Sequence, residues 1–145
     1  MTEKPKNIPQ VYSQKVLEHF RNPQHFGRME NPDGVGRVGN EVCGDIMFIY
    51  IKVEDDIIND ISFETFGCVA AIASSSVTTE LILGKTLGEA IEITNKAVIE
   101  RLGGLPLHKV HCSVLAEEGI KAAIVDYLSR NGRSIDEFEQ NEKTD

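Results

Sequence analysis

The hydrophobic pattern of this 145-residue chain changes period at Gly67, and that change limits the fold more than any other feature of the sequence. From Ile46 to Phe66 the apolar residues form β-rich runs or alternate with polar ones, which is the period of a strand. After Gly67 they recur every three or four positions, which is the period of a helix face. Strands followed by helices predict the α+β class, with helices packed on one face of a small antiparallel sheet.

Three strands are expected in that sheet. Residues 46–53 and 57–66 form the two central candidates, and the polar segment Glu54-Asp55-Asp56 joins them, which indicates an antiparallel hairpin. Residues 35–42 can add a third strand at the edge. The sequence therefore predicts a three-stranded antiparallel sheet.

Five helices are expected around the sheet, four of them with a residue at the start that can cap the first turn. They are the helix after Ser13, the alanine-rich helix at 69–83, the helix that follows the capping box Thr86-Leu87-Gly88-Glu89, the helix after Thr94, and a long helix at 113–131 with Ser113 as its cap. Gly84 and Gly132 end two of them, because glycine readily adopts the backbone conformation that closes a helix.

The length fits a single domain. Residues 1–12 form a polar N-terminal arm with two prolines, residues 13–132 form the folded domain, and residues 133–145 form an acidic C-terminal tail. No internal repeat and no linker divides the chain.

The charge balance excludes some classes of partner. The chain has 15 basic and 23 acidic residues, for a formal net charge of −8, whereas a nucleic-acid binder gains affinity from a basic face. No apolar run approaches the roughly 20 residues that span a bilayer, and the polar start is not a secretory signal. We expect a cytoplasmic protein that contacts neither nucleic acid nor membrane.

Several motifs are weak on physical grounds. The glycine spacing at 34–39 matches a dinucleotide-binding motif, but a strand follows it where that motif needs a helix N-terminus, so a flexible glycine loop is favoured. Residues 74–76 are three serines inside a helical pattern, which indicates close helix packing. His19, His25 and His108 have no metal-ligand spacing and are interpreted as ordinary histidines.

Three cysteines, Cys43, Cys68 and Cys112, carry the chemical information. Each alone is more typical of core packing, but all three lie where a loop meets an expected strand or helix. Cys68 and Cys112 each precede an expected helix, where the helix dipole favours thiolate. Asp45 and His111 are immediate neighbours that can also bind metal. If the three loops converge, they form a site of three thiolates and one or two harder ligands.

The surrounding sequence resembles a known family. Cys43-Gly44-Asp45, Phe66-Gly67-Cys68 followed by an alanine- and serine-rich segment, and Val110-His111-Cys112-Ser113 resemble, in this order, the motifs of the iron–sulfur cluster scaffold family of IscU and the NifU N-terminal domain. The resemblance extends from Tyr12 to about Tyr127. It implies a single α+β domain with a three-stranded antiparallel sheet, in agreement with the periodicity.

The resemblance also implies a function. A cysteine desulfurase would deliver sulfur as a persulfide, with Cys112 as its acceptor, and a [2Fe–2S] cluster would be built from that sulfur and iron on Cys43, Cys68 and Cys112. Asp45 or His111 would complete the ligand set. The cluster would then pass to an apo-protein, and a ferredoxin or an iron donor would be a further partner. Such a chain is a scaffold and a carrier rather than an enzyme.

Two positions bear on the partners that the resemblance implies. The chaperone-docking stretch of the family reads LPPVK, whereas residues 105–109 read Leu-Pro-Leu-His-Lys, which argues against a dedicated chaperone. Tyr12 matches an N-terminal tyrosine of the family that would let two protomers meet around a cluster as a homodimer. A surface aromatic without that role is the alternative.

Two other functions use the same residues. Cys43, Asp45, Cys68 and Cys112 would also form a tetrahedral zinc site in a sulfurtransferase-type protein that relays persulfide and holds no iron, and zinc could occupy the cluster-free scaffold. Cys112 with His111 could act as a nucleophile and base, but adjacent residues at a helix start seldom point at each other. The scaffold is the favoured interpretation.

Overall fold

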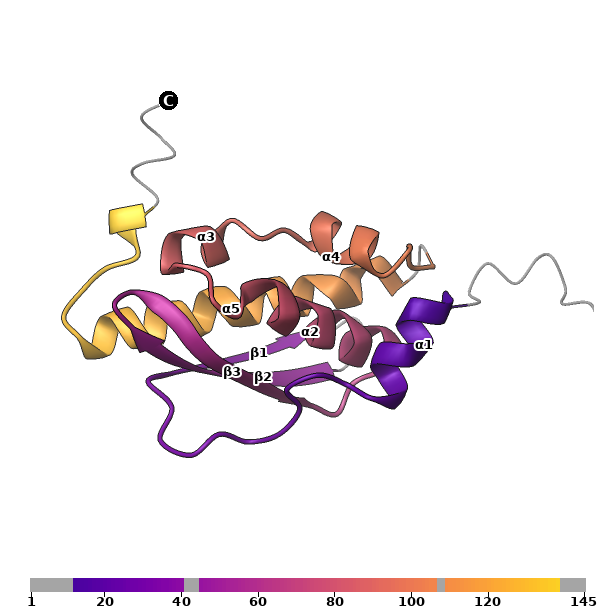
Figure 1. Cartoon of the computed structure of the whole chain (residues 1–145), viewed down its shortest axis with the longest axis horizontal. Helices are drawn as coiled ribbons and strands as arrows, with labels where there is room; N and C mark the ends of the chain where they lie inside the picture. The colour runs from indigo at the N-terminus through magenta and orange to yellow at the C-terminus, as the bar shows by residue number, and fades with distance from the viewer. Residues whose placement is uncertain (1–11, 41–44, 107–108, 139–145) are drawn as a thin grey trace, which may run out of the picture.

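The computed structural model describes residues 12–40, 45–106 and 109–138. Cys43 and His108 lie outside these ranges, and the side chains of Asp45 and His111 also lie outside the description. Within the described part the chain is α+β, and its helices lie over one face of a three-stranded antiparallel sheet (Figure 1). The predicted fold class is confirmed.

The sheet contains β1 (Gly34–Asn40), β2 (Asp45–Glu54) and β3 (Ile57–Thr65) in the order β1-β2-β3. Both pairs are antiparallel, so the expected hairpin and the expected edge strand are confirmed. The hairpin turn consists of Asp55 and Asp56, with φ angles of 57° and 59°. Positive φ at both residues is typical of the two-residue turn whose twist matches that of the flanking strands.

The helices are α1 (Gln14–Arg21), α2 (Val69–Ile82), α3 (Leu87–Ile91), α4 (Asn95–Arg101) and α5 (Val110–Arg130). Three predicted N-caps are confirmed. The hydroxyls of Ser13, Thr86 and Thr94 accept hydrogen bonds from the amides of the first turns of α1, α3 and α4. Glu89 completes the capping box by accepting a bond from the Thr86 amide at 3.0 Å.

The prediction that Ser113 caps the last helix is wrong. Helix α5 begins at Val110, with Lys109 in the N-cap position, where its amide donates to the Pro106 carbonyl at 2.8 Å. Ser113 therefore lies inside the first turn, and its hydroxyl donates to the Val110 carbonyl at 2.6 Å. A serine hydroxyl that bonds a carbonyl three residues earlier is accommodated within a helix, so this residue gives no boundary.

The prediction of a flexible glycine loop at residues 34–39 is also wrong, because these residues form β1. Helix α5 crosses β1 so closely that a Cβ atom on Gly36 would lie 2.2 Å from the Gly119 carbonyl oxygen, and one on Gly34 would lie 2.4 Å from that of Ala123. The glycines are needed because the helix backbone occupies the space of a side chain. Packing, rather than flexibility or nucleotide binding, accounts for the glycines at positions 34 and 36.

The main core lies between the sheet and helices α2 and α5. Its largest fully buried side chains are those of Met47, Ile49, Ile51, Ile58, Ile61, Phe63, Ile82, Leu87, Leu115, Ile120 and Ile124. A second cluster joins Val16 of α1 to Ala73 and Val77 of α2. Helix α2 is therefore shared by both clusters, which explains why it is buried along nearly its whole length.

The described part of the C-terminal segment contacts the domain. The Arg133 guanidinium binds the two carboxylate oxygens of Asp56 at 2.8 and 2.9 Å, and Ile135 and Phe138 pack against the main core. None of the helices in the described ranges is long and apolar enough to span a membrane.

Candidate functional site

The start of β2, the start of α2 and the start of α5 meet at one end of the molecule, on the right in Figure 1. Met47 of β2 pairs with Thr65 of β3 in antiparallel fashion, so the start of β2 and the end of β3 lie at the same end of the sheet. Asp45 begins β2 and Cys68 follows β3, which places both residues at that end. Helix α5 lies against α2, which brings Cys112 to that end as well. The fold therefore brings Cys68 and Cys112, which are 44 positions apart in sequence, to the same end of the molecule.

Cys68 and Cys112 form a close thiol pair. Cys68 is the N-cap residue of α2, Cys112 lies in the first turn of α5, and their Sγ atoms are 3.5 Å apart. Both thiols lie at helix N-termini, as predicted. Cys112 is completely buried, whereas Cys68 is partly exposed. One sulfur of the pair is thus accessible and the other is covered.

A small apolar cluster surrounds the thiol pair. Ala70, Ala71 and Cys112 are fully buried in it, and the partly buried Tyr12 and Leu105 pack against it with Cys68. Burial raises the pKa of the Tyr12 phenol, the nearby Lys109 ammonium acts in the opposite direction, and the two thiols add to the rise. The resemblance suggests a dimer contact for Tyr12, with a surface aromatic as the alternative, whereas the structure places this residue beside the cysteines of its own chain.

The other predicted ligands are only partly located. Asp45 is the first residue of β2, opposite Asn40, and His111 immediately precedes Cys112 in α5. Their side chains and the whole of Cys43 lie outside the described residues. In the described part of the chain, no three histidine, cysteine, aspartate or glutamate side chains are grouped as a metal site. The structure brings together two of the five predicted residues by their side chains.

Two histidines are hydrogen-bonded to α2, in agreement with their interpretation as ordinary histidines. His19 Nδ1 is hydrogen-bonded to Ser76 Oγ at 2.7 Å, and His25 Nδ1 to Thr79 Oγ1 at 2.9 Å. The two bonds attach α1, through His19, and the segment after it, through His25, to helix α2. The serines at 74–76 are fully buried, in agreement with close helix packing. The Ser76 hydroxyl oxygen also accepts a hydrogen bond from the Gln24 backbone amide at 2.8 Å.

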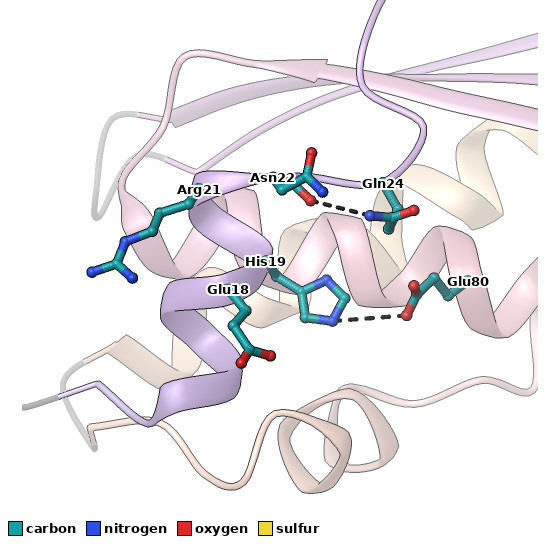
Figure 2. Close-up of a pocket in the computed structure, with 6 residues that line it drawn as sticks. All are labelled: Glu18, His19, Arg21, Asn22, Gln24 and Glu80. Carbon is teal, nitrogen blue, oxygen red and sulfur yellow. Dashed lines mark hydrogen bonds and ion pairs between the residues drawn. The ribbon is translucent and has the colours of Figure 1, made fainter.

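An open surface pocket of about 430 Å³ lies at the junction of α1 and α2. It is lined by Glu18, His19, Arg21, Asn22, Gln24 and Glu80. Figure 2 shows His19 with its ring directed at Glu80, where His19 Nε2 lies 3.7 Å from Glu80 Oε1. Since His19 also bonds Ser76, its two ring nitrogens both have partners, and the pocket contains neither member of the thiol pair.

Residues 11–134 match the model of the NifU-like N terminal domain. This match covers most of the chain, including both members of the thiol pair.

Individual relatives agree with the family match. The chain is 57% identical over 130 residues to a protein of Archaeoglobus fulgidus named iron-sulfur cluster assembly scaffold protein IscU 1, which covers 90% of this chain and 84% of the relative. It is 51% identical over 124 residues to the iron-sulfur cluster assembly scaffold protein IscU of Escherichia coli K12, which covers 83% of this chain and 96% of the relative.

Solved structures show the same fold. A putative iron-sulfur cluster assembly scaffold protein for the SUF system from Fervidobacterium islandicum AW-1 superposes with a TM-score of 0.69 at 25% identity, over 83% of this chain and 99% of that chain. The N-terminal part of a NifU-like protein from Brucella abortus gives the same TM-score at 21% identity, over 85% and 98% of the two chains.

Proposed function

Because this chain belongs to the family of NifU-like N terminal domains, we propose that it is a scaffold on which iron–sulfur clusters are assembled before they pass to apo-proteins. One structural observation supports this proposal. The fold brings Cys68 and Cys112 to a sulfur–sulfur distance of 3.5 Å at two helix N-termini. Thiolates in an electropositive position are the ligands that iron–sulfur clusters require.

The proposed cargo is a [2Fe–2S] cluster held by Cys43, Cys68 and Cys112, with Asp45 or His111 in the fourth position. Four thiolates form the stable centres of electron-transfer proteins. A carboxylate is a harder ligand and matches the cluster less well, so it weakens one corner. Such a weakened corner suits a scaffold, which must release its cluster. The position of Asp45 at the start of β2, at the same end of the molecule as Cys68 and Cys112, supports a ligand from that strand.

The proposed partners follow from the chemistry of assembly. A cysteine desulfurase supplies sulfur as a persulfide, with Cys112 as the acceptor. A ferredoxin or an iron donor is a further partner. Apo iron–sulfur proteins receive the cluster, and two protomers meet around it through Tyr12. The chain turns over no small molecule in this scheme, and zinc occupies the ligands when no cluster is present.

Anaerobic reconstitution tests the proposal. The full chain is incubated with iron, cysteine and a cysteine desulfurase, and visible absorption is recorded together with iron, sulfide and zinc contents. We expect a coloured protein with iron and acid-labile sulfide in equal amounts, and loss of colour in Cys112→Ser. The matched control is Phe66→Ser, an exposed residue of the same loop as Cys68, which should assemble normally.

The competing function gives a different result in the same experiment. A colourless protein that retains one zinc ion per chain, and that accepts sulfur from the desulfurase without binding iron, would identify a zinc-bound persulfide relay.

A further inference from the structure

Cys112 is completely buried, although the proposed function makes it the acceptor of sulfur from another protein. The residues around it differ in how easily they can move. Ala70 and Ala71 belong to α2, which is shared by both core clusters, so moving it would disrupt the domain. Tyr12 and Leu105 are only partly buried and lie in short segments, one before α1 and one between α4 and α5. These two side chains are therefore the movable part of the cover.

One hydrogen bond joins the two movable segments. The Ser13 hydroxyl donates to the Leu102 carbonyl, which is 89 positions away in sequence. Ser13 directly follows Tyr12, and Leu102 lies three residues before Leu105. Both covering side chains also pack against the second cluster, in which Leu102 is fully buried. The bond therefore lies at the base of both parts of the cover.

Two glycines connect Leu105 to the end of α4. Gly103 and Gly104 have φ angles of 79° and 104°, in the region that favours glycine. A Cβ atom on Gly104 would meet nothing within 4 Å, so the backbone conformation, rather than lack of space, requires glycine there. Because glycine adopts many φ and ψ combinations, Leu105 can swing aside without displacing α4.

We propose that Tyr12 and Leu105 form a cover over Cys112 that opens locally, with the hydrogen bond from Ser13 to the Leu102 carbonyl as its latch. This inference rests on the proposed function, because it states how the acceptor sulfur becomes accessible to its donor. Local openings in folded proteins need far less free energy than global unfolding when few buried contacts are broken. Here only side chains at the edges of two clusters move.

The latch can be removed without removing the helix cap. Ser13 Oγ accepts a hydrogen bond from the Val16 amide at 3.1 Å, as the N-cap of α1, and donates to the Leu102 carbonyl. Aspartate is as good an N-cap as serine, but an ionised carboxylate has no proton to donate. Ser13→Asp therefore keeps the cap and loses the latch, whereas Ser13→Thr keeps both.

The test measures how fast a small reagent reaches Cys112. The full-length chain carries Cys43→Ser and Cys68→Ser, so that Cys112 is its one thiol, and serine at position 68 preserves the N-cap of α2. The protein is treated with iodoacetamide in the presence of a metal chelator, at urea concentrations below the unfolding transition. Intact mass follows the reaction, and the denatured chain gives the rate of the uncovered thiol.

We expect Cys112 to react at least about a hundredfold more slowly in the folded chain than in the denatured one. The rate should rise with urea much less steeply than global unfolding does, because a local opening exposes little surface. A slope equal to that of global unfolding would overturn the inference, since Cys112 would then be reached only when the whole domain unfolds. A folded chain that reacts as fast as the denatured one would also overturn it.

The two variants of Ser13 test the latch. Ser13→Asp should react roughly fivefold faster than the parent chain, which is the factor expected from one hydrogen bond, and Ser13→Thr should stay within about twofold of it. An added negative charge raises the pKa of a thiol and slows alkylation, so it cannot be the cause of a faster reaction. Equal rates in both variants would refute the role of this bond.

Two leucines form a matched pair for the cover. Leu105 and Leu81 are both partly buried and pack against the second cluster, but only Leu105 also packs against the cluster that contains Cys112. Leu105→Ala should raise the rate at least about tenfold, and Leu81→Ala should leave it within about twofold in the absence of urea. The same acceleration in both would mean general destabilisation and would overturn the inference.

This experiment is independent of the scaffold function, because it uses neither iron nor a sulfur donor. If the cover fails these tests, reconstitution of the wild-type chain still decides whether a cluster is assembled. A cover that behaves as expected in a chain that binds no iron would refute the scaffold alone.

Discussion

Gly36→Ala tests the close contact between β1 and α5, on which the position of α5 depends. The new Cβ would lie 2.2 Å from the Gly119 carbonyl oxygen and 2.6 Å from the Ala123 amide nitrogen, where ordinary contacts begin at 3.4 Å. Both neighbours are backbone atoms, which cannot rotate away. Helix α5 must therefore move outward from β1 by roughly 1 Å, a gap that forfeits a quarter to a half of the dispersion energy at the affected contacts.

The expected cost follows from these contacts. Overpacking typically costs about 1–3 kcal/mol, and a backbone clash on a helix that buries Leu115, Ile120 and Ile124 belongs at the upper end. Alanine at this position also restricts the unfolded chain, which returns about 0.4–1 kcal/mol. We expect a net loss of about 2 kcal/mol in the free energy of unfolding, which a domain stable by about 5–15 kcal/mol survives.

Urea unfolding followed by far-UV circular dichroism measures this loss. The matched control is Gly88→Ala in α3, where the new Cβ would meet the Phe138 ring at 3.4 Å, an ordinary contact. Alanine is the better helix residue, so the control should be unchanged or more stable by about 0.5 kcal/mol. If both variants have the same stability as the wild type, the close approach of α5 does not determine the glycine at position 36.

Three further predictions concern the proposed cluster site, the cap of α3 and the ion pair between Arg133 and Asp56. Asp45→Ala should leave a cluster that passes to an apo-ferredoxin more slowly, because it removes the proposed harder ligand, and equal or faster transfer would contradict this. Thr86→Ala should lower the free energy of unfolding by about 1 kcal/mol, since the capping box of α3 is lost, and unchanged urea unfolding would argue that the box contributes nothing. The Arg133 guanidinium holds the pKa of the Asp56 carboxyl below its ordinary value. The ion pair therefore contributes to stability above about pH 4, and this contribution is lost as the pH falls through the lower folded-state pKa of Asp56. Arg133→Gln should therefore be less stable than the wild type at pH 7, by a small amount because Asp56 is partly exposed, and the difference should vanish in acid; a difference that grows in acid would refute this assignment.

Much of the fold could be predicted because its local signals agree with one another. The alternating residues of β3, the capping box at Thr86 and the apolar stripe of α5 each favour the element that is found. The two errors have different causes. Gly36 is determined by its close contact with α5, which a local pattern does not contain. Ser113 is a typical cap residue, but its hydroxyl bonds the Val110 carbonyl within the first turn, a local arrangement that serine also adopts inside a helix.

The candidate site could be predicted as a set of residues but not as an arrangement. Cysteines at helix starts indicate thiolate chemistry, and Cys68 and Cys112 were singled out on that basis. Their pairing depends on how α2 packs against α5, and the unequal burial of the two thiols depends on Ala70, Ala71 and Tyr12. A spacing of 43 residues in the sequence contains no information about either.

The hydroxyl groups of α2 explain how Tyr12 comes to lie beside the thiol pair. Ser76 and Thr79 are fully buried hydroxyl residues of α2, and they bind His19 and His25, which flank the end of α1. At the other end of α1, Ser13 donates to the Leu102 carbonyl. Helix α1 is thus held at both ends, and Tyr12 immediately precedes the second anchor. The polar residues that interrupt the apolar face of α2 therefore contribute to the site indirectly, by fixing the helix that carries the tyrosine to the covered side of Cys112.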